Sequence, residues 1–142
     1  MIKTVSKTLA LGAACLGLLA SPALAADATK PVKHYTFVVL TNPVPGKDAE
    51  YNDWYTNTHL HDLVKIPGIK SAQRFKIAPQ SAKGATHQYL ALYEIETDDL
   101  DSVQNAILKA SGTSAMVISP AMDQKSADAQ YFEEITQKVK AK

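Results

Sequence analysis

The chain has 142 residues, with 15 basic and 14 acidic side chains and one cysteine, Cys15. This length fits a single ordinary domain with a substantial core. Because the charge is nearly balanced and no basic stripe runs along the chain, nucleic acid is not the partner that we expect. We expect the partner to be a small-molecule ligand or another protein.

Residues 1–25 have the pattern of a signal peptide. Lys3 and Lys7 precede the short apolar run Thr8–Leu19, and Ser21–Ala25 ends in the small residues that signal peptidase recognises. We therefore predict cleavage after Ala25 and a periplasmic or secreted protein. The apolar run is shorter than the roughly 20 residues that a spanning helix needs, and so is every later segment, so the mature protein is expected to have no membrane contact.

Cys15 lies inside this predicted signal peptide. Lipidation of Cys15 is the alternative, but residues 12–14 are Gly-Ala-Ala and lack the large aliphatic residue that usually precedes a lipidated cysteine. If Cys15 leaves with the peptide, the mature chain has no cysteine. Disulfides, thiolate catalysis and cysteine-based metal sites are then excluded together.

Apolar residues alternate in some segments and recur every three to four residues in others, which separates strands from helices. In chain order the predicted elements are a flexible lead (26–33), a strand (34–40), a helix from Asp48 to the break at Pro67–Gly68, two strands (69–78 and 87–96), a helix from Asp98 to Leu108 with Gly112 as its stop, and a last strand (131–136). We expect the folded domain to span 34–137 and a solvated tail to follow at 138–142.

This order of elements is typical of the ferredoxin-like α+β fold, a βαββαβ antiparallel sheet with two helices on one face. Two helices cover only one face of such a sheet. The strands at 34–40 and 87–96 nevertheless carry apolar residues on both faces. An identical subunit is the simplest cover for the second face, so a homodimer is predicted.

The first helix contains the segment richest in chemically useful groups, Tyr51–Asp62. Tyr55, His59 and Asp62 are spaced i, i+4 and i+7 and therefore share one helix face. Asp62 would fix the tautomer of His59, His59 would act as general base, and Tyr55 would donate to a carbonyl or enolate oxygen. The alternative is that Tyr55 and His59 pack against the sheet while Asp62 is a surface group. A hydrated cavity bordered by His59 and Tyr55 would favour the catalytic hypothesis, whereas a solid barrel interior with His59 fully buried against aliphatic side chains would contradict it.

Two polar residues outside this helix are candidate ligand contacts. Arg74, the sole arginine, could clamp a ligand carboxylate, although a pair with Glu94 or Glu133 across the sheet is favoured. Asn42 could also contact a ligand, but its place before a proline favours a role in the turn.

Aromatic residues supply the remaining candidates. Tyr35 and Tyr89 would suit an amphipathic ligand cavity, although packing on edge strands explains them nearly as well. Trp54 shares a helix face with Tyr51 and Thr58, separate from that of His59, so we predict that it anchors the core or an interface instead of stacking on a ligand.

Several of these residues carry a resemblance to a known family. The segments concerned are Thr41–Pro43, Glu50–Tyr55, His59–Leu60, Ile66–Ile69 and Ala72–Phe75. They resemble the EthD-like group of the dimeric α/β-barrel superfamily and cover most of the mature chain. The resemblance implies two ferredoxin-like sheets packed face to face into a barrel. Relatives include lactone isomerases, polyketide cyclases, cofactor-independent monooxygenases and many proteins with no known activity.

His59 matches the helix histidine of this family, whereas His61 stands where relatives commonly carry proline. Residues two apart on a helix point about 200° apart, so His59 and His61 cannot bind one metal ion and no metal site is predicted. The sequence also lacks a glycine-rich phosphate loop and a dinucleotide fingerprint. No cofactor is expected.

Two hypotheses about function follow. In the first, the protein is an exported dimeric enzyme without a cofactor, an isomerase, cyclase or lyase that uses His59 as general base. Its substrate would be a small oxygenated aromatic, lactone or polyketide-like compound. In the second, it is a non-catalytic binding or stress-related dimeric module whose barrel is filled by side chains.

Overall fold

The computed structural model describes residues 30–141, so the predicted signal peptide, with Cys15, lies outside the described residues. The elements in chain order are β1 (Lys33–Thr41), α1 (Asp48–Trp54), the π-helical turn η1 (Tyr55–His59), α2 (Leu60–Leu63), β2 (Ile69–Lys76), the 3-10 turn η2 (Pro79–Ser81), β3 (Tyr89–Thr97), α3 (Leu100–Ala110) and β4 (Asp128–Glu133). Across the described range, no helix combines the length and the apolar character that crossing a membrane requires.

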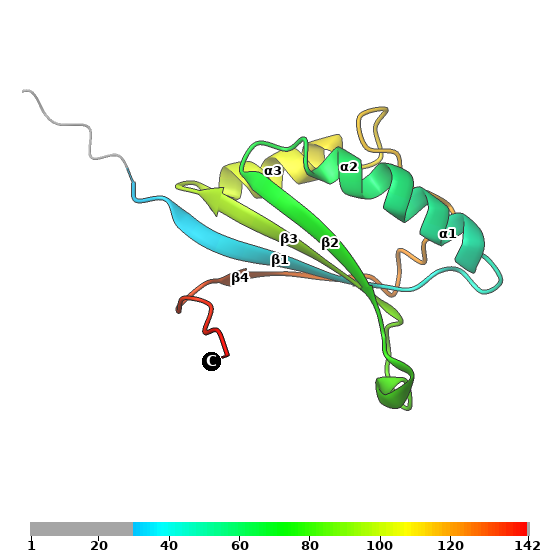
Figure 1. Ribbon diagram of the computed structural model, residues 1–142. Coiled ribbons are helices and arrows are strands. Elements are labelled where there is room, and N and C mark those ends of the chain that lie inside the picture. Colours follow the sequence, from blue (N-terminus) through cyan, green and yellow to red (C-terminus); the bar gives the residue numbers. More distant parts are fainter. Residues whose placement is uncertain (1–29, 142) are drawn as a thin grey trace, which may run out of the picture.

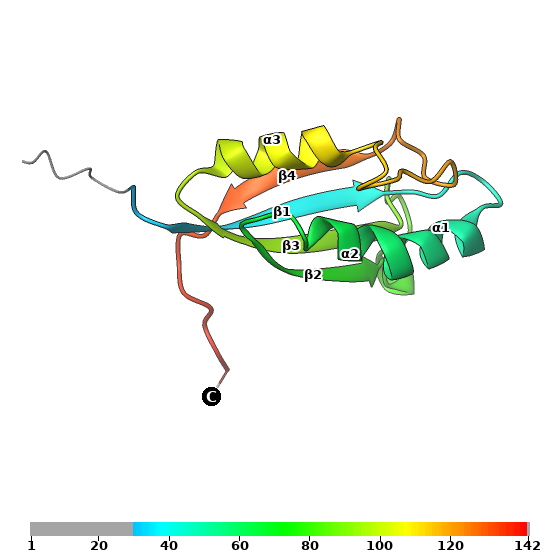
Figure 2. The same ribbon diagram turned by 90° about the horizontal axis from the view of Figure 1, so that it is seen from above.

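The four strands form one antiparallel sheet in the order β2-β3-β1-β4. The helix made of α1, η1 and α2 lies over the same face of this sheet as α3 (Figure 1; Figure 2). Asp99 caps α3, because its side chain accepts a hydrogen bond from the backbone N–H of Ser102. The predicted ferredoxin-like α+β fold is confirmed.

The last strand begins earlier than the sequence pattern predicts, at Asp128 instead of Tyr131, and ends at Glu133. Asp128 and Gln130 are exposed and polar, so apolar alternation does not mark them. They belong to the strand because they continue its pairing with β1, opposite Leu40 and Val38. The register along β1 decides where this strand begins, and local pattern cannot reveal it.

The core lies between the helices and the sheet. Alternate residues of β3 supply most of the buried side chains from the sheet, and the helix supplies large aromatic rings. The buried apolar residues are Phe37, Tyr51, Tyr55, Leu63, Ile69, Tyr89, Ala91, Tyr93, Ile95, Val103, Met116 and Ala121. The core is therefore unusually rich in tyrosine, and the phenol groups bring hydrogen-bonding capacity into it.

Gly68 allows the chain to turn from α2 into β2. Its φ of +96° lies in the region that favours glycine, and a Cβ there would meet Val103 Cγ2 at 2.8 Å. The first helix can therefore pass close to α3 on its way into the sheet.

The connection between α3 and β4, residues 111–127, has no helix or strand, yet parts of it belong to the core. Met116 and Ala121 are fully buried. The carbonyl of Ala121 accepts a hydrogen bond from the Val44 N–H at 2.8 Å, and the N–H of Asp123 donates to the Asn42 carbonyl at 3.0 Å. This connection is thus attached to the segment that precedes α1.

The second face of the sheet, which we call the open face, has no described element packed on it. Its apolar residues are Val38, Leu40, Phe75, Leu90, Leu92 and Phe132. Phe75 is 39% exposed and Phe132 is 51% exposed. The β2–β3 connection and the C-terminal tail both project on this side of the sheet (Figure 1). The open face therefore has the apolar character that the sequence predicts for it.

Candidate functional site

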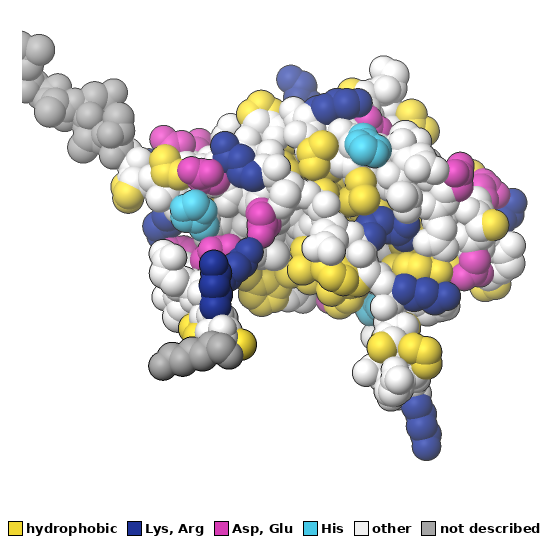
Figure 3. Space-filling model, in the orientation of Figure 1, with side chains coloured by type: hydrophobic (Ala, Val, Ile, Leu, Met, Phe, Trp, Pro, Cys, Tyr) yellow, Lys and Arg dark blue, Asp and Glu magenta, His cyan; other side chains and the backbone are white. Residues whose placement is uncertain are grey.

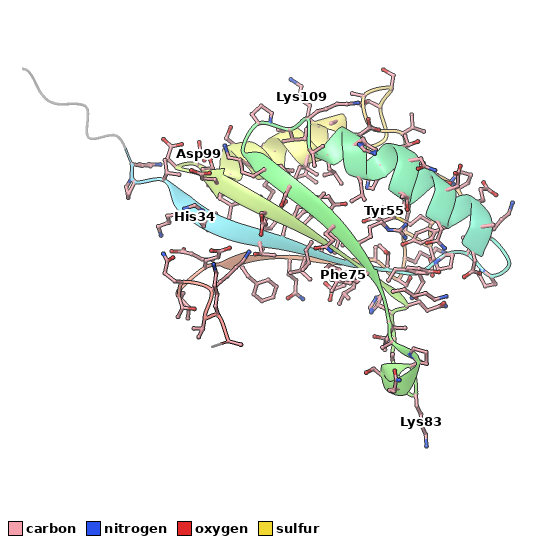
Figure 4. All side chains as sticks on the ribbon, in the orientation of Figure 1. His34, Tyr55, Phe75, Lys83, Asp99 and Lys109 are labelled. Carbon is pink, nitrogen blue, oxygen red and sulfur yellow. The ribbon has the colours of Figure 1, made fainter. Side chains whose placement is uncertain are left out.

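The candidate site forms where the first helix departs from regular α-helical geometry. At Tyr55–His59 the helix makes a π-helical turn, and the N–H of Leu60 donates to the Tyr55 carbonyl five residues back. Such turns are rare, and they occur frequently at functional sites because they change which side chains lie side by side. Figure 4 shows Tyr55 in the layer between this helix and the sheet.

The π-helical turn places Trp54 directly against His59. Their ring centroids are 4.6 Å apart and the planes are inclined by 25°, which is a stacked arrangement. In a regular α-helix, residues five apart would point about 140° from each other. The prediction that Trp54 and His59 occupy separate faces is therefore wrong, because it assumed a regular helix.

His59 is buried among aromatic rings. Its side chain is only 8% exposed, and the ring of Tyr55 meets it edge-on at 4.9 Å. The Nδ1 atom is buried and has no hydrogen-bond partner among the described residues. Burial lowers the pKa of His59 from 6.5 to about 4, so the imidazole is neutral at pH 7. A buried ring nitrogen without a partner is costly, which makes this atom the least satisfied group of the site.

Asp62 does not orient His59 as predicted. The carboxylate accepts a hydrogen bond from Lys65 Nζ at 2.8 Å, and no hydrogen bond joins it to His59 among the described residues. The negative charge of Asp62 opposes the fall in the pKa of His59, but burial dominates. Of the predicted trio, the structure therefore brings together His59 and Tyr55 only.

Tyr55 retains its proton under all ordinary conditions. It is 1% exposed, and burial raises its pKa to about 12. Its hydroxyl oxygen accepts a hydrogen bond from Tyr93 at 3.3 Å. Burial also raises the pKa of Tyr93 far above its ordinary value. Tyr55 can therefore act as a neutral hydrogen-bond donor, which is the role predicted for it.

Arg74 makes neither of the predicted pairs across the sheet. Glu94 pairs with Lys138, and Glu133 pairs with Lys33. The guanidinium instead lies under the first helix, with its carbon 4.3 Å from the centre of the Tyr55 ring. The favoured prediction is wrong because Arg74 shares the helix-facing side of the sheet with Ala91, whereas Glu94 points to the open face. Glu133 lies on β4, at the opposite edge of the sheet from β2.

Two residues that the sequence analysis did not single out connect Arg74 to the helix. Asn52 accepts a hydrogen bond from Arg74 Nη2 on its side-chain oxygen at 3.0 Å, and it donates to the Tyr89 hydroxyl at 2.9 Å. Thr56 accepts from Arg74 Nη1 at 2.7 Å. The only sequence signal was their spacing of four residues, which places both on one side of the helix.

Tyr35 and Tyr89, the tyrosines predicted to line a ligand cavity, contact other groups of the protein. Tyr35 and Tyr89 lie on the central strands β1 and β3, so packing on edge strands is the wrong explanation for them. Tyr89 joins the site through Asn52, whereas Tyr35 packs against the core beside Ile95.

The side chain of Asn42 links three segments of the chain by hydrogen bonds, which agrees with the role in the turn that the sequence favours. It donates to the Thr86 carbonyl at 2.9 Å and to Ser126 Oγ at 3.4 Å, and it accepts from the Gln88 N–H at 2.9 Å. These bonds occupy its side chain within the protein.

The catalytic hypothesis predicts a cavity bordered by His59 and Tyr55. Four hollows of the described chain bear on this prediction. Two of these hollows lie beside the C-terminal tail, one lies beside Gly68, and one of about 230 Å³ lies at the Phe75 end of the open face. None of the four is bordered by His59. Within residues 30–141, no three or more His, Cys, Asp or Glu side chains lie close enough together to hold a metal ion. In this conformation the ring of Trp54 occupies the space beside the imidazole.

We expect the free energy of unfolding to decrease as the pH falls from 6.5 towards 4. The unfolded chain binds a proton at His59 near pH 6.5, whereas the folded protein binds it only near pH 4. The stability is therefore intact above pH 6.5 and is lost progressively below it, by roughly 3 kcal/mol for a shift of this size. Urea denaturation at a series of pH values measures this. His59→Phe should remove this part of the pH dependence, and His61→Asn should retain it.

Comparison with known proteins agrees with this fold. No family model and no curated protein matches the sequence. An EthD family protein from Bacillus halodurans C-125 is 28% identical, with 72% of this chain and 99% of that chain covered and a TM-score of 0.51. SnoaB, a cofactor-independent oxygenase from Streptomyces nogalater, is 12% identical, with 74% and 96% covered and a TM-score of 0.51.

A candidate monooxygenase from Shewanella loihica PV-4 is also similar, with 16% identity, coverage of 75% of this chain and 99% of that one, and a TM-score of 0.52. Fold and comparisons together define an α+β protein with the ferredoxin-like subunit of the dimeric α/β-barrel superfamily. The resemblance to EthD-like proteins of this superfamily that the sequence predicts is confirmed by the likeness to the EthD family protein from Bacillus halodurans.

Proposed function

We propose that the protein is an exported, homodimeric α/β-barrel protein that binds a small oxygenated aromatic, lactone or polyketide-like compound beside His59. The activity proposed for it is a cofactor-independent isomerase, cyclase or lyase reaction with His59 as general base. The observation that carries this proposal is the buried Nδ1 of His59, which has no partner among the described residues. An unpaired buried nitrogen is available to a ligand or a water molecule.

The protonation states of the two central groups fit removal of a proton from an acidic ligand. The neutral imidazole of His59 has a free lone pair at pH 7, because its pKa is about 4. Tyr55, with a pKa of about 12, can donate to an oxygen on which negative charge develops. An imidazole of such low pKa is a weak base. It therefore suits a proton that a neighbouring carbonyl group or aromatic ring has made acidic.

SnoaB is a cofactor-independent oxygenase, so this fold can support catalysis without a cofactor. A ligand would reach His59 only if the ring of Trp54 moved aside. The indole is half-buried, and its N–H donates to the Val117 carbonyl at 3.0 Å. This hydrogen bond, the stacking on His59 and the contacts with the rings of Tyr55 and Tyr51 oppose this movement.

A non-catalytic binding or stress-related module is the second candidate function. It is favoured by the close packing around His59, which is 8% exposed and borders none of the four hollows described above. In that case Trp54 covers the imidazole permanently, and the unpaired nitrogen is a cost of packing.

Proton exchange distinguishes the two candidates. The protein is incubated in D₂O with a panel of unsaturated lactones and aryl ketones, and deuterium incorporation and isomerisation are followed by NMR. We expect His59→Ala and His59→Asn to lower the rate on any reacting compound at least about a hundredfold, as loss of a general base does. His61→Asn is the matched control, because His61 is exposed on the same helix. A rate unchanged in His59→Ala, or no reaction or binding across the panel, contradicts the proposal.

The open face supports the homodimer. Apolar side chains gather there between the projecting tail and the β2–β3 connection (Figure 3), and Lys83 marks the outer end of that connection (Figure 4). Lys138 of the tail pairs with Glu94 at 2.9 Å at the rim of this face. Packing two copies face to face would bury the apolar centre and leave such charged groups at the edge.

Export rests on the sequence pattern of residues 1–25 alone. Amino-terminal sequencing of protein recovered from the periplasm or the medium tests it. Ala26 as the first residue supports cleavage after Ala25, and retention of Met1 contradicts it.

A further inference from the structure

Arg74 is a half-buried charged side chain, and none of the ion pairs of the described residues includes it. A guanidinium in such a place requires other partners. Its carbon lies 4.3, 5.2 and 5.3 Å from the ring centres of Tyr55, Tyr51 and Tyr89. Attraction between the cation and the faces of these rings takes the place of a carboxylate.

The hydrogen bonds of Arg74 converge on the start of the π-helical turn. Nη1 donates to the side chain of Thr56 at 2.7 Å and, at 3.4 Å, to the backbone carbonyl of Asn52, while Nη2 donates to the Asn52 side chain at 3.0 Å. Asn52 lies in the last turn of α1, and Thr56 is the second residue of η1. The planar fork therefore joins the regular helix to the turn that follows it.

This convergence explains why the turn persists. A π-helical turn is rare, so an external contact is needed to stabilise it against local opening. Arg74 supplies such a contact, because it holds a backbone carbonyl and a side-chain hydroxyl on either side of the change in geometry. The stacking of Trp54 on His59 depends on the same turn.

We infer that Arg74 is the positioning residue of the site: its guanidinium fixes the π-helical turn and thereby holds His59 against Trp54 and Tyr55. This inference rests on the proposed function only in that His59 is the proposed base. Arg74 then acts from the protein side, through the helix. A ligand anion is not its main partner, since its two terminal nitrogens already make three hydrogen bonds to acceptors in the protein.

Three variants separate geometry from charge. Arg74→Met removes both the charge and the fork, and Arg74→Lys keeps the charge without the fork. Thr56→Ala removes a single acceptor at an exposed position, so this variant is expected to fold. Lys76→Met is the matched control. Lys76 is also a cation on β2, 5.8 Å from the centre of the Tyr89 ring, but it makes no hydrogen bond to the first helix.

The turn itself is monitored by hydrogen exchange of the Leu60 amide, whose N–H donates to the Tyr55 carbonyl across the π-helical turn. The Tyr51 amide, bonded to the Lys47 carbonyl at 2.9 Å in α1, is the internal reference. We expect Leu60 to exchange at least about tenfold faster in Arg74→Met and Arg74→Lys, and to a smaller degree in Thr56→Ala, with Tyr51 unchanged, because the site opens locally.

The imidazole gives a second readout. Trp54 is the only tryptophan of the sequence, and its indole stacks on His59. Its fluorescence therefore reports protonation of the His59 imidazole. We expect the titration midpoint of Arg74→Met to rise by about one pH unit, because a nearby positive charge is lost and the burial is loosened. Lys76→Met should leave both readouts as in the wild type.

Neither assay requires a substrate, so the inference can fail while the proposed function stands, and the reverse. If the Leu60 amide of Arg74→Lys exchanges at the wild-type rate, the charge is sufficient without the fork, and the inference is overturned. Equal acceleration at Leu60 and Tyr51 would show general destabilisation and would overturn the inference. An unchanged fluorescence midpoint in Arg74→Met would show that Arg74 does not hold His59 in place, and would overturn it as well.

Discussion

Replacing Leu92 by aspartate is expected to convert the proposed dimer into monomers. Leu92 lies in the middle of β3 on the open face, between Val38 of β1 and Gln73 of β2. In a face-to-face dimer the new carboxylate would be buried without a partner, at a cost of several kcal/mol, so association should weaken at least about a hundredfold. Sedimentation equilibrium across a range of concentrations measures this change.

Leu108→Asp is the control for this substitution. Leu108 is 65% exposed on α3, on the opposite side of the sheet from the open face, so the same chemical change should leave the assembly intact. A wild-type protein that remains monomeric at high concentration would contradict the dimer itself. A Leu92→Asp variant that folds and still dimerises would show that the copies meet through another surface.

The largest loss of stability is expected for Tyr51→Ala. Tyr51 is fully buried, and its ring lies 5.5 Å from that of Tyr55 and 5.1 Å from that of Tyr89, between centroids. Removing an aromatic ring from such a position costs about 3–5 kcal/mol, out of the roughly 5–15 kcal/mol that stabilises a small domain. Urea denaturation monitored by circular dichroism measures the free energy of unfolding.

Tyr51→Phe separates the ring from its hydroxyl group. The hydroxyl is 2.6 Å from Thr41 Oγ1, a buried atom that the phenylalanine variant would leave unpaired. We expect this variant to lose about 1–3 kcal/mol, clearly less than the alanine variant. Equal losses in the two variants would mean that the packing of the ring contributes nothing, contrary to the structure.

The order of elements and the apolar open face could be predicted from the sequence, because both depend on local periodicity. Alternation along β1 and β3 and the break at Pro67–Gly68 are visible without knowledge of any contact. The start of β4 could not be predicted. Asp128 and Gln130 have no apolar alternation and belong to the strand only through their partners on β1.

The candidate site was predictable in its residues but not in its geometry. His59 and Tyr55 stand out by residue type and spacing, and the structure does bring them together. The stacking of Trp54 on His59 depends on a π-helical turn, and that turn is supported by Arg74, a residue distant in sequence from Thr56. A helix pattern carries no information about such a contact, so the regular-helix assumption assigned Trp54 to the wrong face and Asp62 to the wrong partner.

The connection between α3 and β4 determines where this fold tolerates changes in chain length. Ordinary surface connections accept insertions, because their backbone is solvated and has no fixed partners. Residues 111–127 are different, since Ala121 is buried and hydrogen-bonded to Val44, and the Val117 carbonyl accepts the indole N–H of Trp54. An added residue there would displace the ring that covers His59. The β2–β3 connection has an exposed outer end at Lys83, so a change in length there is expected to leave the site undisturbed.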